Sequence, residues 1–223
     1  MNKIMNILRT KDVGEMGIGA MIVFIAMVLV AGIAAAVLIQ TANRLEIQAM
    51  ETGEQTKREV ATGLAVFDIE GRVANSKIVN LTITVKPRAG SGDIDLNNTV
   101  IEISNGTLKT LLSYNRSARS FHFRANVSQY SGSVFDTMRW NLTNEEFGIL
   151  RLEDPDTSCT SSTPVINRGD KVMLTINVKA IFGSVGFSPR DDIWGIIIPE
   201  EGSSAVFSFR VPPSLTDAVY RLY

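Results

Sequence analysis

Cysteine and histidine are almost absent from this sequence of 223 residues, which holds one of each. The single cysteine, Cys159, cannot form a disulfide within the chain, and we expect it to be a surface or half-buried thiol. The single histidine, His122, excludes sites that need two imidazoles. Stability must therefore come from a packed core, from assembly or from bound ions.

Neither sign of charge predominates in the chain. The chain has 22 basic and 23 acidic residues, a net charge of −1, which gives no electrostatic basis for binding nucleic acid. The motifs G-x-S-x-G, H-E-x-x-H and C-x-x-C and a phosphate-binding glycine loop do not occur. These gaps predict a protein that is not an enzyme and carries no organic cofactor.

The apolar residues, in contrast, are concentrated near the N-terminus. Residues 16–39 (MGIGAMIVFIAMVLVAGIAAAVLI) contain no charge. As a helix rising about 1.5 Å per residue, they would cover roughly 36 Å, enough to cross a bilayer core of about 30 Å. Residues 1–14 hold three basic residues and one acidic residue, and acidic residues predominate just after the apolar stretch. This asymmetry predicts a cytoplasmic N-terminus with the bulk of the chain outside.

Three interpretations of this apolar stretch compete. A cleaved secretory signal would have a shorter apolar core of about 7–15 residues. A simple membrane anchor would fit the length. The third possibility is a helix that later packs against copies of itself. Small residues four apart, such as Ala31 with Ala35 and Gly32 with Ala36, favour this third interpretation because they let helix backbones approach closely.

The order of residues here resembles the start of the archaeal flagellins (archaellins), type IV pilin-like filament subunits. The resemblance lies in residues 11–14 (KDVG), 15–19 (EMGIG) and the run IVFIAMVLVAGIAA. It implies that a prepilin-type peptidase removes residues 1–14 by cutting between Gly14 and Glu15. Gly19 stands where bacterial type IV pilins usually carry glutamate, so the match is to archaellins.

The resemblance also implies a polymerisation helix, which we expect over residues 15–70. Its contacts with sister helices would come from apolar and small side chains, namely Gly17, Ile18, Gly19, Ile22, Phe24, Ile25, Met27, Leu29, Ala31, Gly32, Ala35 and Leu38. After residue 39 the pattern becomes amphipathic, with helix neighbours such as Val60 and Leu64. Gly71 is expected to mark the change to another structure.

Residues 71–223 alternate between apolar and polar residues in short runs rich in Val, Ile, Thr and Phe. Strands are expected at 77–85, 99–103, 108–114, 120–124, 148–152, 171–180, 193–198 and 205–211. Many short strands separated by turns indicate a β-sandwich or barrel. The predicted fold class is α+β: a long N-terminal apolar helix followed by an all-β sandwich head. The resemblance implies an immunoglobulin-like or jelly-roll head, and the C-terminal residues also look like those of an archaellin.

Glycan acceptor sequences of the form N-x-S/T occur six times, where the composition predicts roughly two. The candidates for N-glycosylation are Asn80, Asn97, Asn105, Asn115, Asn126 and Asn141. Because the predicted topology places them outside the cell, we expect at least some to be modified. Asn80 lies inside a predicted strand and could be blocked.

Acidic residues gather in the segment 154–158 (DPDTS), with a further carboxylate at 170. Hard oxygen ligands of this kind could hold a structural Ca²⁺ ion at Asp154, Asp156 and Asp170. The segment is not an EF-hand loop, and an ordinary solvated turn is the alternative.

Together these features predict a structural subunit of the archaeal flagellum filament, polymerising with itself or other archaellins for swimming motility. The expected partners are a prepilin-type peptidase, the assembly and motor complex in the membrane, and the N-glycosylation machinery. The expected location is the cell surface, with a precursor inserted in the cytoplasmic membrane. The alternatives are an adhesive type IV-like pilin and a membrane-anchored surface glycoprotein that does not polymerise.

Overall fold

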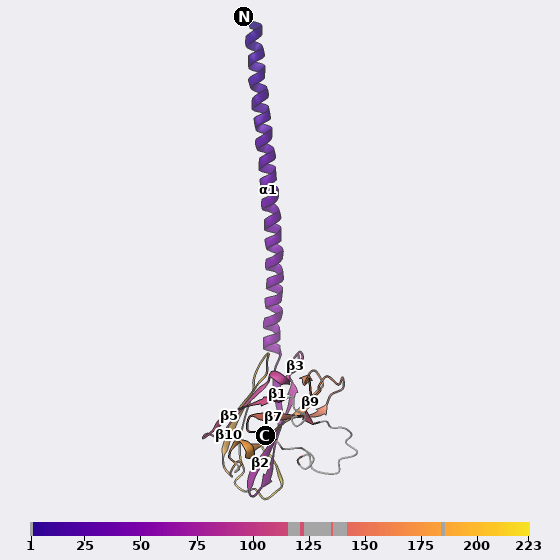
Figure 1. The fold of residues 1–223 in the computed structure, drawn as a ribbon, viewed down its shortest axis with the longest axis vertical. Helices are drawn as coiled ribbons and strands as arrows, with labels where there is room; N and C mark the ends of the chain where they lie inside the picture. The colour runs from indigo at the N-terminus through magenta and orange to yellow at the C-terminus, as the bar shows by residue number, and fades with distance from the viewer. Residues whose placement is uncertain (1, 116–120, 123–134, 136–141, 184–185) are drawn as a thin grey trace. The chain divides into compact units, whose positions relative to one another are not determined.

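The computed structural model describes residues 2–115, 121–122, 135, 142–183 and 186–223, with the side chains of residues 2–15, 121 and 122 left aside. By its internal contacts the chain divides into two compact units, one ending at Gln55 and the other running over Thr56–Tyr223. Figure 1 shows a single long helix, α1, in the N-terminal part and a β-rich head after it. The predicted fold class, a long apolar helix followed by a β domain, is confirmed.

Helix α1 (Asn2–Ala61) is 60 residues long and ends earlier than residue 70, where the sequence analysis placed its end. The last backbone bond of helical type runs from the Thr62 amide to the Arg58 carbonyl, at 2.7 Å. Gly63 then donates its amide to the Ser91 hydroxyl instead, at 3.1 Å. Burial of Leu64 and Ile69 in the head core outweighs the helical spacing that had suggested a continuation.

Gly71 therefore does not mark the end of the helix, and the predicted limit between residues 70 and 71 lies nine residues beyond Ala61, the last residue of α1. It lies inside the strand β1 (Leu64–Ala74). A Cβ atom placed on Gly71 would lie 3.0 Å from side-chain atoms of both Ile78 and Leu222. The glycine thus allows a tight contact within the sheet, rather than a change of structure.

The head contains one ten-stranded sheet with the order β11-β10-β4-β5-β7-β9-β2-β1-β12, with β6 paired to β7, and a two-stranded sheet of β3 and β8. The remaining strands are β2 (Lys77–Pro87), β3 (Ile94–Asp95), β4 (Val100–Ser104), β5 (Lys109–Tyr114), β6 (Phe121–His122), β7 (Glu146–Glu153), β8 (Val165–Ile166), β9 (Lys171–Ile176), β10 (Asp192–Ile198), β11 (Ala205–Arg210) and β12 (Val219–Arg221). A 3-10 turn, η1 (Leu96–Asn98), and a short helix, α3 (Val178–Ile181), complete the described elements.

All eight predicted strands overlap observed ones, but the strand expected over 171–180 stops at Ile176. The Asn177 side chain accepts a hydrogen bond from the Ala180 amide at 3.2 Å and caps α3. A side-chain acceptor at this position supports a helical turn, so the apolar alternation beyond it does not continue as a strand.

The two halves of the large sheet share one hydrophobic core. Phe187 shows how: its backbone pairs with Ile78 of β2, and its ring lies 6.4 Å, centroid to centroid, from Phe209 of β11. Strands β2 and β11 are far apart in the strand order. The sheet therefore curves so that its inner faces meet, as expected for a sandwich-like head.

The end of α1 is fixed to the head by backbone contacts. The Ser203 amide donates to the Thr62 carbonyl at 2.8 Å, and Gly63 forms a parallel bridge with Ser203. Gly202 has a φ of +91°, and a Cβ atom there would lie 2.2 Å from the Thr62 carbonyl oxygen. Only a glycine fits this close approach, which places the start of β11 beside the end of the helix.

Candidate functional site

The predicted polymerisation surface lies entirely within α1, and its side chains are exposed. The four consecutive residues Ile22, Val23, Phe24 and Ile25 are 55–68% exposed. Four consecutive positions point to all sides of a helix, so the apolar surface is continuous around it. The segment is long and apolar enough to cross a membrane, and the chain itself buries none of its apolar window.

Small residues in this helix leave room for another helix to approach closely. Cβ atoms built at Gly17, Gly19 and Gly32 would meet nothing within 4 Å. Each glycine in a helix interior costs about 1 kcal/mol relative to alanine, and the head gains nothing from these three. Close approach of the backbone of another helix would explain why glycine stands at these three positions.

The predicted cleavage residues, Gly14 and Glu15, also lie in α1. Their side chains are outside the described part of the structure, so the cut between them stays a prediction.

The three predicted calcium ligands are brought together by strand pairing. Asp154 follows β7 and Asp170 precedes β9, and these antiparallel strands pair Glu153 with Lys171 at that end. The segment after β7 then returns Asp156 to the same place. One carboxylate oxygen from each of the three aspartates lies within 4.8 Å of the others. Two oxygens bound to the same Ca²⁺ ion lie at most about twice the usual Ca²⁺–oxygen distance of about 2.4 Å apart, so these three oxygens are close enough to share one ion.

The three carboxylates differ in their surroundings. Asp154 forms a salt bridge with Arg151 at 2.6 Å. Asp156 is exposed and accepts a hydrogen bond from the Asn167 side chain, which with the Ser158 amide lowers its pKa to about 2. Asp170 is only 3% exposed, and burial is the main cause that raises its pKa above the ordinary 3.8. The charges of the two other aspartates raise this pKa further.

Asp170 carries the most informative atom of this acidic loop. Its Oδ2 atom accepts from the Asn167 amide at 2.8 Å and from the Ser158 hydroxyl at 3.4 Å. Its Oδ1 atom is buried without a hydrogen-bond partner among the described residues. A buried carboxylate oxygen left without a donor is costly, and a cation would satisfy it while offsetting the repulsion among the three charges. The donor set therefore fits a hard divalent cation.

The predicted glycan acceptors lie in unequal positions. Asn105, in the turn between β4 and β5, is partly exposed and its side-chain oxygen accepts from the Thr107 and Leu108 amides at 3.1 and 2.9 Å. Asn115 is exposed just after β5. Asn97 is half-buried, and the hydroxyl of its partner Thr99 is buried and donates to the Asp95 carbonyl at 3.1 Å.

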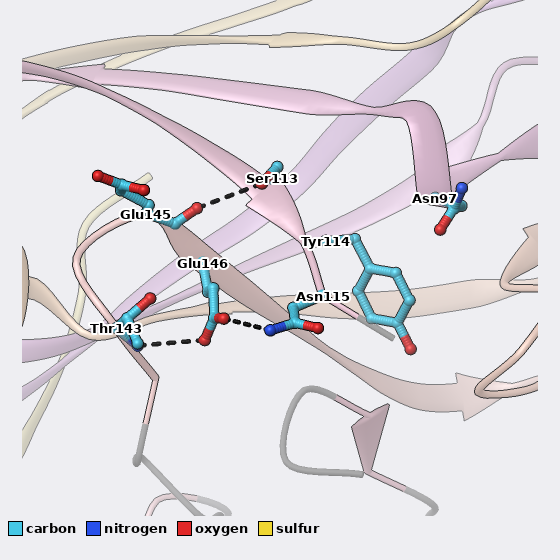
Figure 2. A pocket seen from close by; sticks show the side chains of 7 residues that line it. All are labelled: Asn97, Ser113, Tyr114, Asn115, Thr143, Glu145 and Glu146. Atoms are coloured by element: carbon cyan, nitrogen blue, oxygen red, sulfur yellow. Dashed lines mark hydrogen bonds between the residues drawn. The ribbon is translucent and has the colours of Figure 1, made fainter. Parts of the chain in front are cut away.

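Asn97 and Asn115 line the same open polar pocket of about 520 Å³ (Figure 2). There the Asn115 amide nitrogen donates to the Glu146 carboxylate, whose other oxygen accepts from the Thr143 amide at 3.3 Å. Thr143 is the hydroxyl residue of the sequon at Asn141, so residues from three of the six sequons line this pocket.

In the other three sequons, the acceptor asparagine is either buried or outside the described residues. Asn80 is 7% exposed within β2, so its side chain is not presented on the surface of the folded head. Asn126 and Asn141 lie outside the described residues. All six remain predictions as glycan sites.

Cys159 is fully buried, not the surface or half-buried thiol that the sequence suggested. Burial is the main cause that raises its pKa to about 12, which keeps the thiol protonated and inert at neutral pH. Sequence reasoning missed this because the polar residues around it, Asp154 to Thr163, look like a solvated loop.

Comparison with known proteins gives a consistent result. A family model described as archaeal-type flagellin matches residues 14–209. Flagellin B2 of Methanocaldococcus jannaschii is 46% identical over 201 residues, covering 89% of each chain, and flagellin B3 of that organism is 40% identical, covering 94% of this chain and 95% of its own.

Solved structures agree with these relatives. The crystal structure of archaeal flagellin FlaB1 from M. jannaschii matches with a TM-score of 0.61 and 28% identity, over 73% of this chain and 97% of that chain. The archaeal flagellum of Methanospirillum hungatei has the same fold, with a TM-score of 0.61 at 16% identity, over 91% of this chain and 98% of that chain. The match of the family over most of the chain, and of relatives over nearly their full length, leads to one conclusion: this chain belongs to the archaeal-type flagellin family.

Proposed function

We propose that this chain polymerises by burying residues 16–39 of α1 against the same segment of other subunits, with the head on the outside of the resulting filament. As an archaeal-type flagellin it is a structural subunit of the archaeal flagellum, a cell-surface filament that serves swimming motility. The family is one of structural filament proteins, not of enzymes. The observation that carries the proposal is the apolar helix surface that the chain leaves uncovered.

The energetics favour assembly once the helix leaves lipid. Burying one Leu, Ile or Phe side chain stabilises by about 1.5–3 kcal/mol relative to water. Residues 16–39 carry fifteen large apolar side chains of Ile, Leu, Val, Met and Phe on all sides of the helix, and each is at least half exposed. A bundle of sister helices covers them, whereas contact with one head would cover a single side only. Repetition of such a contact gives an open helical array.

Processing of the precursor is part of this proposal. A prepilin-type peptidase would remove residues 1–14 at the cytoplasmic face of the membrane, with the head outside, before an assembly and motor complex adds the subunit to the filament. The basic residues Lys3, Arg9 and Lys11 support an N-terminus on the cytoplasmic side. The family match, which begins at residue 14, supports a mature chain that starts next to it.

We predict that the subunit in shed filaments begins at Glu15. Gly14→Val should leave the precursor uncut and abolish filaments, because a branched side chain at the cleaved bond hinders approach of the peptidase. Gly17→Ala, three residues further on and with free space around it, is the matched control and should be cut normally. N-terminal sequencing of filaments and membranes measures both; filaments whose subunits retain Met1 would contradict the proposal.

Glycosylation of the head is the second part of the proposal, and the structure favours Asn105 and Asn115 as acceptors. Both lie at strand ends, where a sugar needs no rearrangement of the core. Peptide mass mapping of filaments should find sugar on these two residues and none on the buried Asn80. Asn98, next to Asn97 but outside any sequon, is the internal control. Sugar on Asn80, or none on any sequon, would count against this assignment.

We also propose that the acidic loop binds Ca²⁺ through Asp154, Asp156 and Asp170 and so stabilises the head. A ligand present at about a hundred times its Kd stabilises by about 2.7 kcal/mol, which corresponds to roughly 5–10 °C in Tm for a domain of this size. Ca²⁺ should therefore raise the Tm of the full-length protein, and Asp170→Asn should remove most of the rise. The control is Asp192→Asn, because that exposed carboxylate pairs with Arg210 away from the loop.

The effect should depend on pH in a defined direction. Because burial raises the pKa of Asp170, its carboxylate is lost earlier on acidification, and the Ca²⁺-dependent rise in Tm should shrink as the pH falls. Without Ca²⁺, acidification has the opposite effect on the stability of the fold. The contribution of protonated Asp170 is fully present below pH 3.8 and is lost as the pH rises through the raised pKa. An equal rise in Tm for wild type and Asp170→Asn would refute calcium binding here.

A further inference from the structure

The turn between β4 and β5 contains an Asn-Gly pair, Asn105-Gly106, and every other asparagine of the sequence is followed by a residue with a side chain. Asparagine is thermally labile, because the backbone nitrogen of the next residue can attack its side-chain amide carbon. A glycine at the next position leaves that nitrogen without the steric shield of a Cβ atom. This turn is therefore the place where such an attack is expected first.

The fold itself requires the glycine of this pair. Gly106 has a φ of +83°, a backbone conformation that residues with side chains rarely adopt. It is exposed, and a Cβ atom built on it would meet nothing within 4 Å. The turn thus needs glycine for its backbone, and as a consequence it presents an unshielded nitrogen next to the side chain of Asn105.

Backbone hydrogen bonds polarise the side chain of Asn105. Its Oδ1 atom accepts from the Thr107 amide at 3.1 Å and from the Leu108 amide at 2.9 Å. These donors draw electrons away from Cγ. They also face the oxygen on which negative charge develops when a nucleophile adds to that carbon, as the donors of an oxyanion hole do. The arrangement therefore favours attack on Cγ.

The attacking nitrogen is activated by the same turn. The Gly106 amide donates to the Ser104 hydroxyl at 3.2 Å, and this hydroxyl donates in turn to the Leu108 carbonyl at 3.0 Å. A hydroxyl that donates its own proton is a stronger acceptor, because successive hydrogen bonds polarise one another. It draws the proton of the Gly106 amide away from the nitrogen, which makes this nitrogen more nucleophilic.

We propose that Asn105 is a site of spontaneous deamidation, and that a sugar on its side-chain nitrogen protects the turn from this reaction. The Gly106 nitrogen bonds to Cγ of Asn105 and gives its proton to water. The bond between Cγ and Nδ2 breaks, and Nδ2 takes up a proton and leaves as ammonia. Water then opens the cyclic imide at either of its carbonyl carbons, which yields aspartate or isoaspartate without any oxidant or reductant.

Both products change the turn permanently. Aspartate places a negative charge where a neutral amide stood. Isoaspartate carries the chain through the side-chain carbon, which lengthens the backbone in the turn that aligns Ser104 of β4 with Lys109 of β5. Because neither product keeps Nδ2, the sequon at Asn105 can no longer accept a sugar. Deamidation and glycosylation therefore compete for the same atom.

A sugar on Asn105 opposes the cyclisation. It replaces one hydrogen of Nδ2, so this nitrogen could leave only as a bulky glycosylamine, and the sugar hinders the approach of the Gly106 nitrogen to Cγ. The inference rests on the proposed glycosylation of Asn105. It gives the sugar there a chemical role, the protection of a turn whose backbone requires a labile sequence.

Variants of Thr107 separate the two reactions. Thr107→Ala removes the sequon but keeps the Asn-Gly pair, whereas Thr107→Ser keeps both and is the matched control. The side chain of Thr107 is exposed, and its backbone amide, which bonds to Asn105, is present in both variants. Asn75 is an internal control, because it is exposed in the turn between β1 and β2, outside any sequon, and is followed by Ser76.

The full-length proteins are produced in the same archaeal host and incubated in water enriched in a heavy oxygen isotope. Opening of the imide takes one oxygen from water, so peptide mass mapping measures both the sugar and the deamidation at each asparagine. Asn105 of Thr107→Ala should deamidate about tenfold faster than Asn75 of the same sample and than glycosylated Asn105 of wild type and Thr107→Ser. Adding Gly106→Ala to Thr107→Ala should slow Asn105 to the rate of Asn75, because a Cβ atom then shields the nitrogen.

The outcomes distinguish this inference from the glycosylation on which it rests. Equal deamidation of Asn105 with and without its sugar would overturn the protection while leaving glycosylation intact. Equal rates at Asn105 and Asn75 in Thr107→Ala would overturn the lability of the turn. A rate at Asn105 unchanged by Gly106→Ala would overturn attack by the Gly106 nitrogen. Absence of sugar from wild-type Asn105 would instead refute glycosylation at this residue, and the protection with it.

Discussion

The rest of the structure depends on the need to cover residues 16–39 of α1. This segment has no charge and is apolar on every side, and the described residues of the chain do not bury it. In water the exposure of these side chains would cost more than the whole stability of an ordinary domain, about 5–15 kcal/mol. Lipid and other helices can both meet this demand, and for this reason we propose that the segment passes from the membrane into the filament.

The head must therefore fold independently of the helix contacts. Its sheet curves around one core, in which Phe147, Phe187 and Phe207 are completely buried. The backbone contacts of Thr62 and Gly63 with Ser203 join the end of α1 to the segment just before β11.

Much of this architecture could be predicted from local sequence. An uncharged stretch longer than a bilayer core indicates a helix that its own domain does not bury. The two-residue alternation located every long strand except β1, and it missed the short strands β3, β8 and β12. Strand β1 was missed because Leu64 and Phe67 also fit helical spacing with Val60. The choice between helix and strand there is made by the core, since Leu64 and Ile69 are fully buried against distant strands.

Features set by contacts between distant segments were harder to predict. The sequence suggested that Asp154, Asp156 and Asp170 could act together, but only the pairing of β7 with β9 brings one carboxylate oxygen of each to within 4.8 Å of the others. The same pairing buries Asp170, whose Oδ1 has no hydrogen-bond partner among the described residues. Burial of Cys159 follows from the same packing.

Electron cryomicroscopy of shed filaments tests the central claim most directly. The account predicts that residues 16–39 lie in the filament core and pack against sister helices at interaxial distances of about 8–10 Å, without lipid between them. A reconstruction in which lipid surrounds each of these helices, or in which the segment lies on the outside of the filament, would contradict it.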